Sequence, residues 1–262
     1  MSDQLTAAST AQPQPAPDDD DLGIDRDFLL KMAQIPFLAI GWTAAAWLAH
    51  LLWGATVGDL TQPPEGSPAN LGPLVVVCIG MILAAIIDGW AFRVPNWLTL
   101  SLVVSGWYLG ILHEFGVAVD AGRGGFGSAF SCTLVGFFLL FPLLPIRGMG
   151  EGDVKMTMGF ASWLGAFYGY DPGLKVLLIA FVAGVIVGGI FGLVMMACRR
   201  QFYKNWQNTV EIARDVGVLL IEGPSKAAAR AEERHKYRVR LPYGVPLCVG
   251  FLGYLAYFYL NN

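Results

Sequence analysis

The sequence Gly148-Met149-Gly150-Glu151-Gly152-Asp153-Val154-Lys155 is a glycine-rich, charged turn between two long apolar runs. The run before it ends at Ile146, and the run after it begins at Met156. An acid at the mouth of a membrane span is costly to ionise, so Asp153 is a candidate functional residue. The glycines allow close backbone packing and positive φ values, which can aim the aspartate at a partner.

The composition around this turn is that of an integral membrane protein. The 262 residues are 55% hydrophobic and only 14% charged, whereas soluble domains carry about 25% charged residues. Seven apolar runs come close to the ~20 residues that cross a bilayer. We expect them to be helices, because in lipid only a helix or a closed barrel satisfies its own backbone. The sequence thus predicts an all-α membrane protein of about seven transmembrane helices, at about residues 35–57, 71–87, 97–115, 126–146, 156–170, 174–197 and 245–260.

Two polar segments accompany these runs. Residues 1–24 are rich in Ala, Pro, Gln and Ser and carry four consecutive aspartates at positions 18–21, a composition that predicts a disordered acidic tail. Residues 199–240 separate the last two runs, and their apolar residues recur at helical spacing, which favours a helix on the membrane surface with a basic end. We therefore expect a polytopic membrane domain over residues 25–262, with this amphipathic loop before its last span.

The distribution of Lys and Arg predicts the orientation. If the N-terminus lies inside, all 17 basic residues fall on the inner side except Arg123 and Lys175. The positive-inside rule therefore places the N-terminus in the cytoplasm. The turn that carries Asp153 then faces the cytoplasm as well.

Topology gives Asp153 a candidate partner. Asp88 lies at the predicted cytoplasmic end of the second run, at the same membrane depth. Two close carboxylates cannot both ionise freely, so they share a proton. The ionised member can take a proton from water while the other donates one to a carbonyl oxygen. A structural alternative is equally open at this point: Asp153 caps the fifth helix, as Asp often does, and Asp88 pairs with Arg93.

Three motifs resemble those of the type IV prepilin peptidases. The turn at residues 150–153 is similar to the family's GxGD motif, and Asp88 followed by Arg93-Val94-Pro95-Asn96-Trp97-Leu98-Thr99 resembles its Asp then (Ile/Val)-Pro-Asn-x-Leu-Thr segment. Leu241-Pro242-Tyr243-Gly244 looks like the start of the family's last span. The resemblance covers roughly residues 71–258.

The resemblance implies an intramembrane aspartic endopeptidase with Asp88 and Asp153 as its catalytic pair. Such an enzyme removes the short basic leader of a prepilin or pseudopilin at the cytoplasmic face of the inner membrane. Arg93, Asn96 and Lys155 are expected to orient the acids or to contact the leader, and the further motif residues are Gly150, Gly152 and Pro95. The longer members of the family carry paired CxxC motifs in a methyltransferase region. Because no CxxC occurs here, we expect peptidase activity without N-methylation, as in the short forms that process Flp-type pilins.

Other classes fit the sequence less well. The four cysteines are dispersed and the three histidines form no HExxH motif, so we expect no metal and no cofactor. Outside one loop there is no basic stripe with interleaved aromatics, which argues against nucleic acid. The expected partners are the prepilin helix and the lipid bilayer. Two alternatives stay open: a preflagellin-type peptidase, which the substrate alone would distinguish, and a non-catalytic membrane scaffold or transporter subunit.

Overall fold

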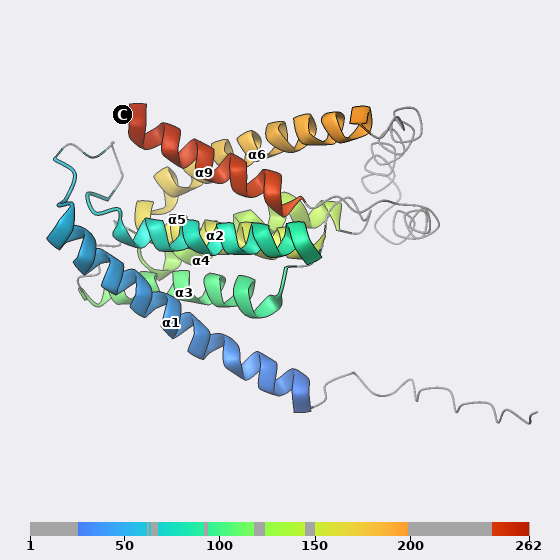
Figure 1. Cartoon of the computed structure of the whole chain (residues 1–262). Coiled ribbons are helices and arrows are strands. Elements are labelled where there is room, and N and C mark those ends of the chain that lie inside the picture. Colours follow the sequence, from blue (N-terminus) through green and yellow to red (C-terminus); the bar gives the residue numbers. More distant parts are fainter. Residues whose placement is uncertain are drawn as a thin grey trace, which may run out of the picture.

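The computed structural model of the chain describes residues 26–61, 63, 68–91, 94–117, 124–144, 150–198 and 243–261. Within these ranges the chain is all-helical and forms no strand, which confirms the predicted fold class. Each of the seven apolar runs coincides with a helix (Figure 1). The elements are α1 (Arg26–Thr56), α2 (Gly72–Ala91), α3 (Asn96–Glu114), α4 (Phe126–Leu140), the 3-10 turn η1 (Phe141–Leu143), α5 (Glu151–Tyr168), α6 (Tyr170–Cys198) and α9 (Gly244–Asn261).

Helix α5 is the centre of the bundle. It packs most extensively against α4 and α3 and also contacts α6, α2 and α9. All its residues from Gly159 to Tyr168 are buried. Small residues make this close packing possible, since a Cβ atom at Gly165 would lie 2.5 Å from the carbonyl oxygen of Ser128 on α4.

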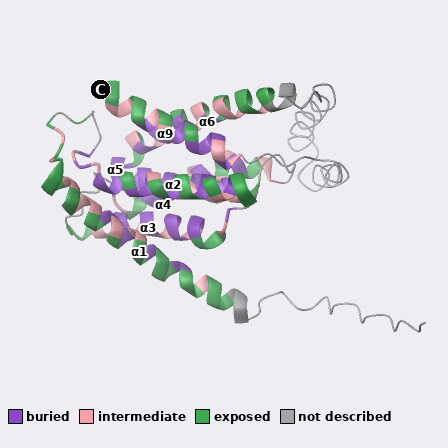
Figure 2. Ribbon diagram, in the orientation of Figure 1, coloured by how far each residue is buried: buried purple, intermediate pink, exposed green. Residues whose placement is uncertain are grey.

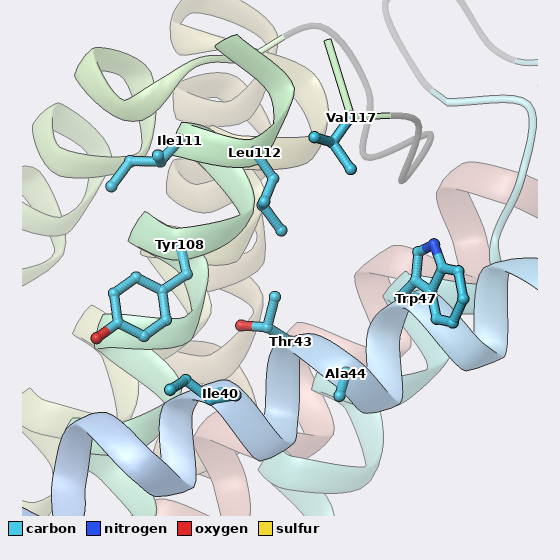
Figure 3. A pocket seen from close by; sticks show the side chains of 8 residues that line it. All are labelled: Ile40, Thr43, Ala44, Trp47, Tyr108, Ile111, Leu112 and Val117. Carbon is cyan, nitrogen blue, oxygen red and sulfur yellow. The ribbon is translucent and has the colours of Figure 1, made fainter. Parts of the chain in front are cut away.

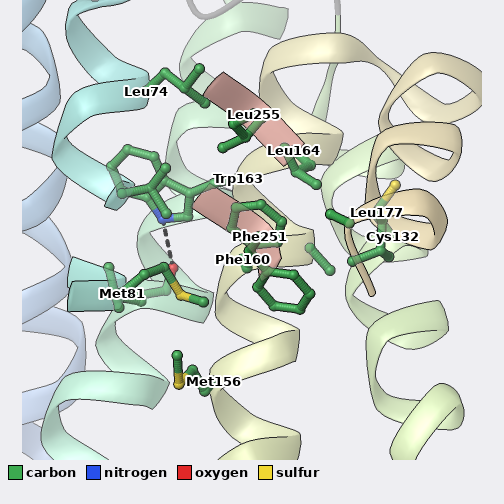
Figure 4. Close-up of a cluster of buried hydrophobic side chains, with 14 of the residues drawn as sticks. Leu74, Met81, Cys132, Met156, Phe160, Trp163, Leu164, Leu177, Phe251 and Leu255 are labelled. Carbon is green, nitrogen blue, oxygen red and sulfur yellow. Dashed lines mark hydrogen bonds between the residues drawn. The ribbon is translucent and has the colours of Figure 1, made fainter. Parts of the chain in front are cut away.

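The buried polar groups of α5 are bonded inside the bundle. The Trp163 side chain donates its Nε1–H to the carbonyl oxygen of Leu102 on α3, at 2.9 Å. On another side, the rings of Phe160 and Phe251 stack with centroids 4.4 Å apart, which joins α5 to α9 (Figure 4). Helix α5 is therefore held by protein on several sides.

Within the part of the chain that the structure describes, five helices are long and apolar enough to cross a membrane, namely α1, α2, α4 with η1, α6 and α9. Large apolar side chains are exposed on the outer helices, for example Ile79 and Ile86 on α2 and Ile186 and Ile190 on α6. Figure 2 shows exposed residues along α1 and along the C-terminal half of α6, while buried residues gather around α5. Apolar surface of this extent is stable in lipid rather than in water. The chain is thus a membrane protein.

The remaining two helices, α3 and α5, are not among these five candidate spans. A helix surrounded by other helices needs no apolar surface toward lipid, and α5 accordingly carries buried polar residues such as Thr157 and Ser162. That α3 and α5 cross the membrane, which would give seven spans, stays a prediction. The acidic tail and the 199–240 loop lie outside the described residues, and the predicted domain boundary at residue 25 is untested.

Candidate active site

Four helix ends meet at one end of the bundle. Asp88 lies in the last turn of α2 and Asp153 in the first turn of α5, while α3 and α9 begin at Asn96 and Gly244. Direct contacts join these ends: a Cβ atom at Gly152 would lie 3.0 Å from the Val94 side chain, just before α3. Residues far apart in the sequence thus form one local cluster.

Asp88 is a buried carboxyl bonded to another helix. Its side chain is 6% exposed, and its Oδ2 accepts a 2.9 Å hydrogen bond from the backbone N–H of Gly244, 156 residues away. A Cβ atom at position 244 would lie 2.7 Å from that same oxygen. Because real Cβ atoms do not approach so closely, a side chain at position 244 would force the Asp88 carboxyl or the helix start to shift.

Asp153 is 5% exposed and is the third residue of α5. Its Oδ2 accepts a 3.1 Å hydrogen bond from the backbone N–H of Gly150, the N-cap residue. A carboxyl at this helical position commonly reaches back to the N-cap backbone. The N-cap position that the sequence offered to Asp153 is held by Gly150, and Asp153 supports the helix start from the third position through one of its carboxyl oxygens.

The structure brings the two predicted acids close enough to interact. Asp153 lies outside the five candidate membrane-spanning helices. The pKa of Asp153 is raised to about 7, first because the carboxyl is buried and second because of the negative charge on Asp88, while the bond from Gly150 partly offsets both. An acid with this pKa holds its proton in about half of the molecules at neutral pH. Such a group can donate a proton under ordinary conditions.

The predicted supporting residues Asn96 and Lys155 bond to each other. The Lys155 Nζ donates to the Asn96 Oδ1 at 2.9 Å and lies 3.5 Å from the carboxylate of Glu151, whose side chain is 80% exposed. These contacts tie the first turn of α5 to the first residue of α3. Pro95 is the N-cap residue of α3, with φ −72°. Arg93 lies outside the described residues, and so does its expected pairing with Asp88.

The sequence motifs did not reveal what Gly244 contacts. It falls in one of the segments that carry the family resemblance, but no role could be assigned to it there. The signal available was a glycine at the start of an apolar run, directly after Pro242-Tyr243. Glycine at such a position indicates close backbone approach, although the sequence does not say to what.

No group of three or more His, Cys, Asp or Glu residues among the described ranges is arranged to hold a metal ion. An apolar groove of about 520 Å³ lies between α1 and α3, where Tyr108 and Leu112 face Thr43 and Trp47 (Figure 3). Tyr108 is twelve residues along α3 from Asn96, which corresponds to roughly 18 Å. This groove is therefore separate from the acids.

Comparison with protein families identifies one match. Residues 75–193 match the model of the type IV leader peptidase family. The matched residues include Asp88, the turn at residues 150–153 and most of α2 through α6, whereas α1 and α9 lie outside them. Comparisons with curated proteins and with solved structures yield no match.

Proposed function

We propose that the chain cleaves the leader of Flp-type prepilins, with Asp88 and Asp153 as its catalytic pair. The proposal starts from the match of residues 75–193 to the type IV leader peptidase family. The family implies an aspartic peptidase in general. The observation that supports these two residues is their placement: both carboxyls are buried at one end of the bundle, and the charge of one acts on the other.

In the proposed reaction a water molecule attacks the carbonyl carbon of the scissile peptide bond. The Asp88 carboxylate takes one proton from this water, and the Asp153 carboxylic acid gives its proton to the carbonyl oxygen. The tetrahedral intermediate that results is neutral. It collapses when a proton passes from Asp88 to the leaving nitrogen and the C–N bond breaks, while Asp153 recovers a proton from the hydroxyl that becomes the new carboxylic acid. We assign the donor role to Asp153 because its raised pKa keeps it partly protonated at neutral pH.

The proposal includes a location. Seven apolar runs support seven spans, the asymmetry of Lys and Arg supports an N-terminus in the cytoplasm, and the family match supports the inner (cell) membrane. Both acids then lie at the cytoplasmic face, where a prepilin presents its basic leader while its apolar helix stays in the bilayer. Because the sequence holds no CxxC motif, we propose that the new N-terminus is not methylated by this chain.

The test is processing of a co-expressed Flp-type prepilin in membranes, with Asp88→Asn and Asp153→Asn made separately. Asparagine preserves the shape and the hydrogen-bond acceptor but removes the titrating proton. We expect uncut precursor to accumulate in both variants at wild-type levels of membrane insertion. Asp171→Asn is the matched control, since this exposed acid begins α6 at the opposite end of the bundle. Wild-type cleavage by either test variant would contradict the paired-acid mechanism.

A non-catalytic scaffold is the second candidate, and one observation favours it. Each acid accepts a backbone N–H at a helix start, so each has a structural role without any chemistry. Asparagine can accept the same bonds, so a scaffold would tolerate both substitutions. A preflagellin-type substrate is tested in the same assay, by exchanging the co-expressed precursor.

A further inference from the structure

Helix α9 begins directly against Asp88. The first residue of a helix has a backbone N–H without a partner inside the helix, and in α9 this N–H is donated to the Asp88 carboxyl. The next residue also contacts α2, because a Cβ atom at Gly89 would lie 3.4 Å from the Val245 side chain. The start of α9 is thus seated on the last turn of α2.

The remainder of α9 is held by other helices, so the position of its first residue is fixed. Gly250 on α9 is in direct backbone contact with Gly184 on α6. On the side of α5, Phe251 stacks on Phe160, with an interplanar angle of 7° (Figure 4). These contacts lie two turns or less from Gly244. A donor delivered by a packed helix holds its partner more precisely than one on a free loop.

The bond constrains the carboxyl in a way that suits proton transfer. Because Oδ2 of Asp88 receives the N–H, Oδ1 is the oxygen left for water. The start of a helix also carries a partial positive charge, which favours a negative group beside it. Both effects serve a carboxylate that must be ionised and correctly turned when water approaches. Asp153 on α5 is the titratable group whose charge interacts with Asp88.

We propose that Gly244 is a positioning residue for the peptidase reaction: its backbone N–H orients the Asp88 carboxylate, and its lack of a side chain leaves the space that this carboxylate occupies. The inference rests on the proposed catalytic function of Asp88. It extends the site to a helix outside the matched residues 75–193.

The experiment compares Gly244→Ala with Gly253→Ala, using purified full-length protein in detergent and a Flp-type prepilin precursor as the probe. Both variants place one methyl group in α9. At Gly244 this methyl group meets the Asp88 carboxyl, whereas at Gly253 nothing lies within 4 Å. A misplacement of about 1 Å costs on the order of 100-fold in rate. We therefore expect Gly244→Ala to lose about 100-fold in kcat with KM nearly unchanged, and Gly253→Ala to keep the wild-type rate.

The pH profile separates positioning from general damage. If Gly244 orients the ionised Asp88, the acidic limb of kcat/KM moves to higher pH in Gly244→Ala and stays in place in Gly253→Ala. A purely structural loss lowers the rate equally at every pH. A wild-type rate and profile in Gly244→Ala, while Asp88→Asn is inactive, would overturn the role of Gly244 and leave the proposed function intact. Cleavage by Asp88→Asn would instead overturn the proposed function itself.

A second measurement covers the outcome in which Gly244→Ala does not fold. The thermal midpoint, or the folded yield, is compared among Gly244→Ala, Asp88→Ala and the double variant. Truncating Asp88 removes its Cγ and Oδ2, two of the atoms that the new methyl group would meet. We expect Gly244→Ala to be far less harmful in the Asp88→Ala background. Equal harm in both backgrounds would show that Gly244 does not act through Asp88 and would overturn the proposal.

Discussion

At the scale of single residues, Asp153 combines a functional property with a cost in stability. Its pKa is about 7 in the folded protein and about 3.9 in an unfolded chain. The folded state therefore holds the proton more tightly, and ionising the buried acid destabilises it. Well below pH 4 both states are protonated and no penalty exists. The penalty grows between about pH 4 and pH 7 and levels off above pH 7, at about 4 kcal/mol.

Asp153→Asn should accordingly be more stable than the wild type at pH 8, and this difference should shrink toward pH 4. Asparagine can still accept the bond from Gly150, so the helix cap is preserved. The measurement is the thermal midpoint in detergent across this pH range. The matched control is Asp171→Asn, which makes the same substitution at an exposed residue in the first turn of α6. A stability gain that is the same at every pH would contradict the assigned cause.

At the scale of helices, the site depends on how α5 is seated between its neighbours. Gly165 lies against the backbone of α4, and a backbone atom cannot rotate away as a side chain can. Gly165→Ala should therefore push α4 and α5 apart, at a cost of about 1–3 kcal/mol. It should also lower peptidase activity, although Gly165 is roughly 18 Å along α5 from Asp153.

The matched control for this effect is Gly192→Ala, because the space around Gly192 on α6 is open. Size-exclusion chromatography and the thermal midpoint of both variants, extracted in the same detergent, provide the comparison. If the two variants behave alike, the close approach of α4 to α5 is not what Gly165 provides.

The contact between Lys155 and Asn96 acts at the same scale, since it links the start of α5 to the start of α3. Lys155→Met should lower kcat about tenfold, because a small displacement of Asp153 weakens proton transfer. Glu151→Gln should change little, because it removes a half-exposed ion pair of small energy and leaves the Lys155–Asn96 bond in place. Kinetics of both variants on the same precursor test this prediction. Equal losses would assign the effect to the ion pair instead.

At the scale of the whole molecule, the orientation in the membrane follows from charge and from the number of spans. Seven spans with the N-terminus inside place the C-terminus outside. A green fluorescent protein fused after residue 262 should therefore be dark, whereas alkaline phosphatase at the same point should be active. The opposite pattern is expected for fusions after residue 198, at the end of α6. A fluorescent fusion after residue 262 would mean that α3 or α5 does not cross.

The molecule also shows which features could be predicted from the sequence. The helices could, because long apolar runs in lipid have few alternatives to a helix. The ends of the helices could be predicted less well. Helix α1 begins at Arg26 rather than near residue 35, because polar residues at a membrane surface can continue a helix without adding to its hydropathy. The closeness of Asp88 to Asp153 was predicted from topology and agrees with their interaction in the structure. The bonds Gly244–Asp88 and Lys155–Asn96 could not be predicted, because each depends on how distant helix ends pack in space.

The bond between α2 and α9 joins an early helix to the last helix that the structure describes. At a synthesis rate of about 5–20 residues per second, Gly244 is made roughly 10–30 seconds after Asp88. Until then the Asp88 carboxyl has no donor from α9, and its final orientation awaits the arrival of this helix. The cluster of helix ends that holds Asp88 and Asp153 is therefore completed late in biosynthesis, once the last described helix has been made.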